Sequence, residues 1–174
     1  MELTLRHRPL APVDPASLFR VAAGEPGLVW LDSSLPGGAY GRWSYLMRRP
    51  VITLDGAGGR WRLRHGAGEE AVDGDPFERI ERMTRRGVTW ADPSADLPPF
   101  TGGAVGFLGY GLAPWGEPSL NLTAPPAPEG DLRIGWYDGF IAFDHQTGRS
   151  IAVGSADADL HALAHSADEA RRLP

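Results

Sequence analysis

The feature that most constrains the fold is a pair of short strand-like segments separated by a glycine-rich turn. Residues 51–54 (Val-Ile-Thr-Leu) and 60–64 (Arg-Trp-Arg-Leu-Arg) flank the sequence Asp-Gly-Ala-Gly-Gly at 55–59. Glycine adopts the positive φ angles that tight hairpin turns require, so the two segments are predicted to pair as antiparallel neighbours. The fold is therefore expected to contain an antiparallel sheet.

Further segments are predicted to be strands because they alternate polar and apolar residues or form short apolar runs. These segments are 2–6, 28–31, 42–47, 132–143 and 149–153. The run from Leu132 to Phe143 is aromatic-rich and is the strongest of them, and it is predicted to be one continuous strand. Proline-containing stretches at 36–38, 91–100 and 113–131 are predicted to be loops or irregular.

Helix signals are fewer than strand signals. Asp14-Pro15 and Asp75-Pro76 each place a capping carboxylate before a proline at the first helical position. The alanine-rich tail at 156–173 is also predicted to be helical. Many strands and few helices indicate an α+β fold of mostly antiparallel β-sheets with a few flanking helices.

Composition excludes several classes of protein. The chain of 174 residues has no cysteine, which rules out disulfides, zinc–thiolate sites and a thiol nucleophile. Its formal net charge is −5 and its basic residues are scattered, so a nucleic-acid-binding face is not expected. No apolar run resembles a secretory signal or a membrane span, so we expect a cytoplasmic protein with no membrane partner.

Several local motifs have a simple structural interpretation. The glycine-rich segment 100–111 does not match a phosphate-binding loop, and its glycines are predicted to allow close backbone approach within a sheet. His161 and His165 would share a helix face with Asp157 nearby, which is half of a metal site. A histidine pair of this kind is more common without metal. The tryptophans in predicted strands are expected to anchor the core; they are Trp30, Trp43 and Trp136.

Three segments, in this order and spacing, carry a family resemblance: 31–46 (LDSSLPGGAYGRWSYL), 98–112 (PPFTGGAVGFLGYGL) and 136–149 (WYDGFIAFDHQTGR). Together they resemble the amino-terminal region shared by component I of aminodeoxychorismate synthase and of anthranilate synthase. The resemblance covers essentially the whole chain. The Tyr137-Asp138 pair and the Phe143-Asp144-His145 run resemble the aminodeoxychorismate enzymes more closely.

The resemblance implies the amino-terminal half of the anthranilate synthase component I-like fold, with one domain at 1–155 and a helical tail at 156–174 leading to an absent chorismate-binding domain. In the family the catalytic residues and the magnesium-binding glutamates lie in that other half. No catalytic or metal-binding residue is therefore assigned here, no cofactor is expected in this chain, and magnesium is expected in the parent enzyme. Alone, the chain is expected to be inactive.

The implied function is that of a non-catalytic domain of aminodeoxychorismate synthase, in folate biosynthesis from chorismate. The implied partners are a glutamine amidotransferase and the chorismate-binding carboxy-terminal half. One alternative is the same domain of anthranilate synthase, in tryptophan biosynthesis. A second alternative is a stand-alone module that binds an amino acid or a partner without catalysis.

The resemblance also implies one wall of a site for free tryptophan. The candidate residues lie at the end of one strand and the start of the next; they are Leu31, Asp32, Ser33, Arg42, Trp43 and Ser44. A carboxylate such as Asp32 can pair with an α-ammonium group, and a serine hydroxyl can donate or accept. The structural alternative is a cross-strand ion pair between Asp32 and Arg42, with Ser33 as a turn residue. The wall requires the two strand ends to lie side by side.

Overall fold

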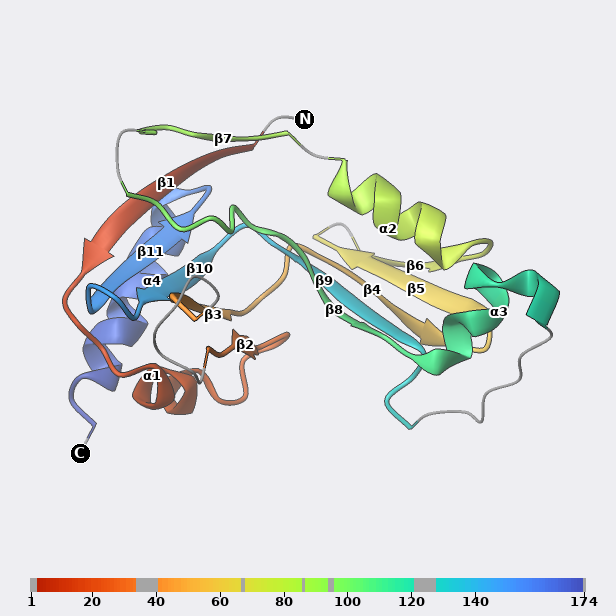
Figure 1. The fold of residues 1–174 in the computed structure, drawn as a ribbon, viewed down its shortest axis with the longest axis horizontal. Coiled ribbons are helices and arrows are strands. Elements are labelled where there is room, and N and C mark those ends of the chain that lie inside the picture. Colours follow the sequence, from red (N-terminus) through yellow and green to blue (C-terminus); the bar gives the residue numbers. More distant parts are fainter. Residues whose placement is uncertain are drawn as a thin grey trace. The chain divides into compact units, whose positions relative to one another are not determined.

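The computed structural model describes residues 3–33, 41–66, 68–85, 87–93, 96–120 and 128–173. The chain divides into two compact units, each built from segments far apart in the sequence (Figure 1). Unit 1 contains Met1–Arg49, Gly87–Gly102 and Asp138–Pro174, and unit 2 contains Pro50–Arg86 and Gly103–Tyr137. Each unit has its own mostly antiparallel sheet with helices, which confirms the α+β prediction. The expected loop at 36–38 lies outside the described residues.

The sheet of unit 1 has six strands in the order β2-β3-β10-β11-β1-β7. Its strands are β1 (Leu3–Leu10), β2 (Val29–Leu31), β3 (Trp43–Met47), β7 (Val88–Trp90), β10 (Phe140–Asp144) and β11 (Arg149–Gly154). Neighbours pair antiparallel except β1 and β7, which are parallel. The sequence did not predict β7, because Val88-Thr89-Trp90 is short and lacks the apolar run that marks the equally short β2.

Two helices of unit 1, α1 (Pro15–Ala22) and α4 (Asp157–Ala170), lie side by side, and α4 also packs on β11 and β1 (Figure 1). Helix α1 begins as predicted, because the Asp14 carboxylate accepts the Ser17 backbone N–H at 2.8 Å. Helix α4 confirms the predicted helical tail. The core between helices and sheet includes Leu18, Ala22, Leu46, Ile141 and Leu163.

The sheet of unit 2 has five strands in the order β6-β5-β4-β9-β8. They are β4 (Ile52–Ala57), β5 (Arg60–His65), β6 (Gly68–Val72), β8 (Gly103–Leu108) and β9 (Leu132–Tyr137). Helix α2 (Pro76–Thr84), the short α3 (Ala113–Gly116) and the 3-10 turns Tyr110–Leu112 and Pro118–Leu120 complete the unit. The predicted hairpin is confirmed, but its turn is only Gly58-Gly59, with φ angles of 58° and 78°.

The prediction of one strand from 132 to 143 is wrong. Strand β9 ends at Tyr137, β10 begins at Phe140, and the two belong to different sheets. Most residues of both strands are buried, and apart from Arg133 and Asp144 both strands are apolar, so periodicity cannot show the break between them. The only local signal is the dipeptide Asp138-Gly139, of a type common in turns; Asp138 accepts a hydrogen bond from Ser155 Oγ at 2.7 Å.

The glycine-rich segment forms β8, as its structural interpretation predicted. At Gly106 a Cβ atom would lie 1.9 Å from the Arg133 carbonyl oxygen of the neighbouring strand β9. Close approach of two backbones therefore explains this glycine, and a phosphate-binding role is not needed.

Candidate functional site

The two strand ends that carry the candidate wall lie side by side. Strands β2 and β3 pair antiparallel, with Leu31 opposite Tyr45. Beyond the last pair, the Ser33 backbone N–H donates to Ser44 Oγ at 2.9 Å, and Ser33 Oγ donates to the Trp43 carbonyl at 2.7 Å. These bonds continue the pairing with side chains and fix the position of residues 32–33. The adjacency that the sequence predicted is confirmed.

Ser44 is the buried centre of this arrangement, with 0% of its surface exposed. Its Oγ lies 3.2 Å from Asp32 Oδ1 and 2.7 Å from His145 Nε2, and it accepts the Ser33 N–H. A hydroxyl has one proton and two lone pairs. The Ser44 hydroxyl donates its proton to Asp32, so His145 donates to it through Nε2–H. With the Ser33 N–H as the second donor, all hydrogen-bonding positions of the hydroxyl are then occupied. Ser44 therefore orients Asp32 and is unsuited to act as a nucleophile.

The remaining wall residues differ in their access to solvent. Leu31 is 42% exposed and Asp32 is also exposed, whereas Ser33 and Trp43 are half-buried. An apolar side chain and a carboxylate are thus presented together at the end of β2. Leu31 and Asp32 are the most exposed side chains of the wall, while Ser33 and Ser44 hold them in place.

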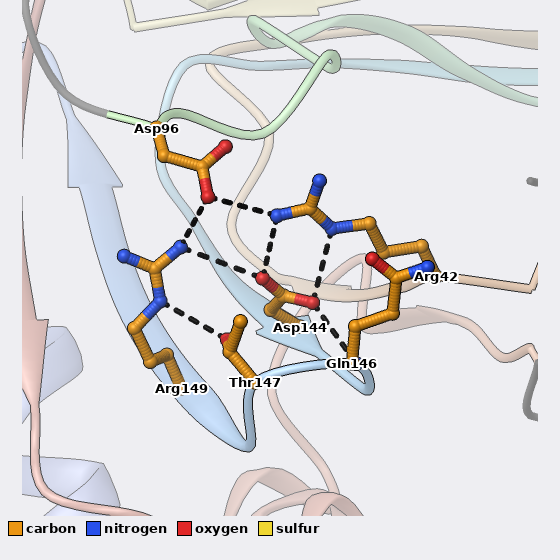
Figure 2. Close-up of polar contacts among 6 residues, drawn as sticks. All are labelled: Arg42, Asp96, Asp144, Gln146, Thr147 and Arg149. Carbon is orange, nitrogen blue, oxygen red and sulfur yellow. Dashed lines mark hydrogen bonds and ion pairs between the residues drawn. The ribbon is translucent and has the colours of Figure 1, made fainter.

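Arg42 turns away from Asp32, so the structural alternative of an Asp32–Arg42 ion pair is wrong. The guanidinium instead binds Asp144 through two bonds, Nε to Oδ1 at 3.1 Å and Nη2 to Oδ2 at 2.8 Å (Figure 2). It also lies 4.9 Å from the centroid of the Trp43 ring. Asp144 is 1% exposed. The hydrogen bonds from Arg42 hold the pKa of Asp144 far below its usual value, and the bonds to Asp144 raise the pKa of Arg42.

Two further charged residues complete a cluster around Asp144. Asp96, from the segment between β7 and β8, accepts hydrogen bonds on Oδ2 from Arg42 at 2.9 Å and from Arg149 at 2.6 Å (Figure 2). The Arg149 guanidinium also lies 3.5 Å from Asp144 Oδ2. Segments distant in sequence thus meet in one group of alternating charges, which we call the charge cluster: Arg42, Asp96, Asp144 and Arg149.

The sequence of this chain is similar to parts of longer known proteins. No protein-family model matches the chain. Anthranilate synthase component 1 of Arthrobacter globiformis is 37% identical over 125 residues, which are 69% of this chain and 22% of that protein. Aminodeoxychorismate synthase component 1 of Bacillus subtilis is 28% identical over 106 residues, which are 61% of this chain and 22% of that protein. The chain is a homologue of these component I proteins.

The fold of this component I homologue is also similar to that of a solved structure. Anthranilate synthase component I of Streptococcus pneumoniae TIGR4 superposes with a TM-score of 0.55 at 20% identity, over 80% of this chain and 32% of that chain. The chain spans less than a third of the length of the relatives described here. That partial coverage fits an N-terminal domain of these longer proteins.

The histidine pair of this component I homologue is engaged in surface contacts. His161 Nδ1 lies 3.3 Å from Arg8, His165 lies 3.6 Å from Glu169, and Asp157 pairs with Arg6 at 2.9 Å. Within the described ranges, no group of three or more His, Asp or Glu side chains is arranged to hold a metal ion. None of the helices in the described part of the chain has the length and apolar character needed to cross a membrane.

Sequence reasoning missed His145, Asp144, Asp96 and Arg149 as parts of the site. His145 lies in the turn after β10, and its contact with Ser44 spans 101 positions. Asp144 does carry a local signal, because it is followed by a turn in which its Oδ1 accepts the Gln146 backbone N–H at 3.0 Å. Its partnership with Arg42 depends on β3 pairing with β10, which no local pattern specifies.

Proposed function

We propose that this chain is the non-catalytic amino-terminal domain of a chorismate-using synthase component I. In this proposal it serves as a scaffold for the carboxy-terminal, chorismate-binding half and works with a glutamine amidotransferase that supplies ammonia. The homology to two such synthases and the partial coverage support it. The described residues offer no ligand set that fits magnesium, so no step involving the metal is assigned to this chain.

Two products are candidates for the parent enzyme. The residues around 136–145 favour aminodeoxychorismate, whereas the higher identity of the Arthrobacter globiformis relative favours anthranilate. The full-length parent protein should convert chorismate and ammonium to one of these products in the presence of magnesium. Chromatography distinguishes aminodeoxychorismate from anthranilate with pyruvate, and formation of neither product would refute the proposal.

We further propose that the wall formed by Leu31, Asp32, Ser33, Arg42, Trp43 and Ser44 binds a free amino acid, with tryptophan as the candidate. The observation that carries this proposal is the pair of Ser33 bonds to Ser44 and Trp43, at 2.9 Å and 2.7 Å. They present the Asp32 carboxylate for an α-ammonium group and leave Leu31 exposed for apolar contact. Arg42 contributes through its position on Trp43 rather than through Asp32.

The tryptophan proposal is tested by calorimetry with two ligands. Indole-3-propionate keeps the ring and carboxylate of tryptophan but lacks the ammonium group. In the full-length parent protein, tryptophan should bind about 10–100-fold more tightly than indole-3-propionate. The reason is that the charge-assisted hydrogen bond from the ammonium group to Asp32 is worth about 1.5–3 kcal/mol. Asp32→Asn should remove that difference.

Asp73→Asn is the matched control, since Asp73 is an exposed carboxylate in unit 2. It should keep the preference for tryptophan. Absence of saturable heat at millimolar tryptophan, or an Asp32→Asn protein that still prefers tryptophan, would refute the assignment of this wall.

A further inference from the structure

The two carboxylates of the charge cluster are held very differently. Asp144 ends strand β10, its side chain is 0% exposed, and it accepts both Arg42 and the Gln146 backbone N–H. Asp96 lies in a segment that is neither helix nor strand, and its side chain is 56% exposed. Asp144 is therefore a fixed part of the fold, whereas Asp96 is an exposed side chain held through its two arginines.

The fixed charges of the cluster do not balance without Asp96. Arg42 and Arg149 bring two positive charges, and Asp144 neutralises one of them. The remaining positive charge is neutralised by the Asp96 carboxylate. Its Oδ2 lies 2.9 Å from Arg42 Nη2 and 2.6 Å from Arg149 Nη2 (Figure 2). Each guanidinium donates one charge-assisted N–H···O bond to this oxygen, and we call the two arginines together the carboxylate clamp.

The arginines of the clamp are oriented without help from Asp96. Arg42 is fixed by its two bonds to Asp144 and by the Trp43 ring. Arg149 is held by Nε donating to Thr147 Oγ1 at 3.0 Å. The side chains of Arg42 and Arg149 are 27% and 46% exposed, so a small solute can reach them. The clamp would thus keep its shape if the Asp96 carboxylate moved out.

We infer that the position of the Asp96 carboxylate is a binding site for small carboxylic acids, with Asp96 as a built-in occupant that a ligand displaces. The site shares Arg42 with the proposed tryptophan wall, but Asp96, Asp144 and Arg149 are not part of that wall, so the two proposals can be tested separately. Displacement is local, because Phe100 in the same segment remains packed on Tyr45 and Phe140, with ring centroids 5.3 Å and 5.1 Å apart.

Competition with Asp96 sets the expected affinity. A tethered group acts at an effective concentration of roughly millimolar or more, so it weakens the apparent affinity of a free competitor. The natural chain should therefore bind a simple carboxylate weakly. Removing the charge of Asp96 should strengthen binding of acetate by about tenfold or more.

The test is a titration of the 174-residue chain with sodium acetate, at ionic strength held constant with sodium chloride. Nuclear magnetic resonance would follow the Arg149 Nε–H and the Gln146 backbone amide, which both lie in the cluster. We expect saturable shifts in the natural chain, saturation at about tenfold lower acetate in Asp96→Asn, and no saturation in the double variant Asp96→Asn/Arg149→Gln. Glu81→Gln, which breaks an exposed ion pair with Arg85, should behave like the natural chain.

Three results would each overturn the inference. They are the absence of saturable shifts in the natural chain, equal acetate affinity in the natural chain and Asp96→Asn, and binding that survives loss of Arg149. If Asp96→Asn does not fold, Asp96→Ala replaces it with the same expected results. Because the tryptophan experiment depends on Asp32 and this one on Asp96 and Arg149, either proposal can fail while the other stands.

Discussion

Replacing Gly106 with alanine is expected to unfold unit 2 at a much lower urea concentration than the natural chain requires. The added Cβ would lie 1.9 Å from the Arg133 carbonyl oxygen and 2.8 Å from Ile134 Cα, both backbone atoms of the paired strand β9. Backbone atoms cannot move aside as a side chain can, so β8 must separate from β9. We expect a loss of at least about 3 kcal/mol in the free energy of unfolding.

Gly66→Ala is the matched control for this experiment. An added Cβ at Gly66 meets no atom within 4 Å, and its φ angle is not in the left-handed region. Its unfolding free energy should stay within about 0.5 kcal/mol of the natural chain or rise slightly, because alanine restricts the unfolded state. Circular dichroism during urea unfolding measures both variants, and equal stability of the two would contradict the close approach seen at Gly106.

The second large effect is expected at Asp144, in unit 1. Asp144→Asn removes the fixed negative charge of the cluster, so the guanidinium groups of Arg42 and Arg149 lose their buried counter-charge. This loss should lower the free energy of unfolding by about 2–3 kcal/mol at neutral pH. The pH dependence follows from the pKa of Asp144, which Arg42 lowers from its usual 3.8. The unfolded chain therefore binds more protons than the folded chain in acid, so stability rises with pH in that range.

Asp144 thus contributes stability that is present above its unfolded pKa and is lost as the pH falls towards its folded pKa. The natural chain should lose stability from about pH 5 downwards, and Asp144→Asn should show a flatter acid limb. Urea unfolding at a series of pH values measures this. Asp157→Asn is the control, because Asp157 forms an exposed pair with Arg6 that should be worth no more than about 1 kcal/mol. Parallel acid limbs in Asp144→Asn and the natural chain would show that Arg42 does not hold Asp144 charged.

Local chemistry made much of this fold predictable. The Asp-Pro helix starts are correct because a capping carboxylate acts within its own turn, as at Asp14 and Asp75. The hairpin of β4 and β5 is correct because Gly58 and Gly59 supply the positive φ angles it needs. The turn is shorter than the sequence predicts, because residues 55–57 belong to strand β4. At Gly56 in that strand, a Cβ would lie 2.0 Å from the Arg60 carbonyl oxygen.

In the candidate site, contacts between residues close in sequence could be predicted, whereas contacts between distant residues could not. Residues 32–33 and 42–44 are close in sequence, so two adjacent strands were enough to bring them together. The charge cluster could not be found in this way, because Arg42 and Asp144 are 102 positions apart and Arg42 and Asp96 are 54 apart. The sequence does not reveal which residue pairs with an arginine at the start of a strand. Here the partner is set by the strand register, which places Asp144 opposite Trp43 and so next to Arg42.

The order of the strands in unit 1 has a consequence for how the protein is made. Strands β1 and β3 emerge from the ribosome before β10 and β11, the strands that join them in the sheet. Until those residues are synthesised, β1 and β3 lack their central neighbours and their apolar side chains stay uncovered. Hairpin β4–β5 can form meanwhile, because its two strands are adjacent in sequence. Nascent chains should therefore depend on chaperones until β11 is complete.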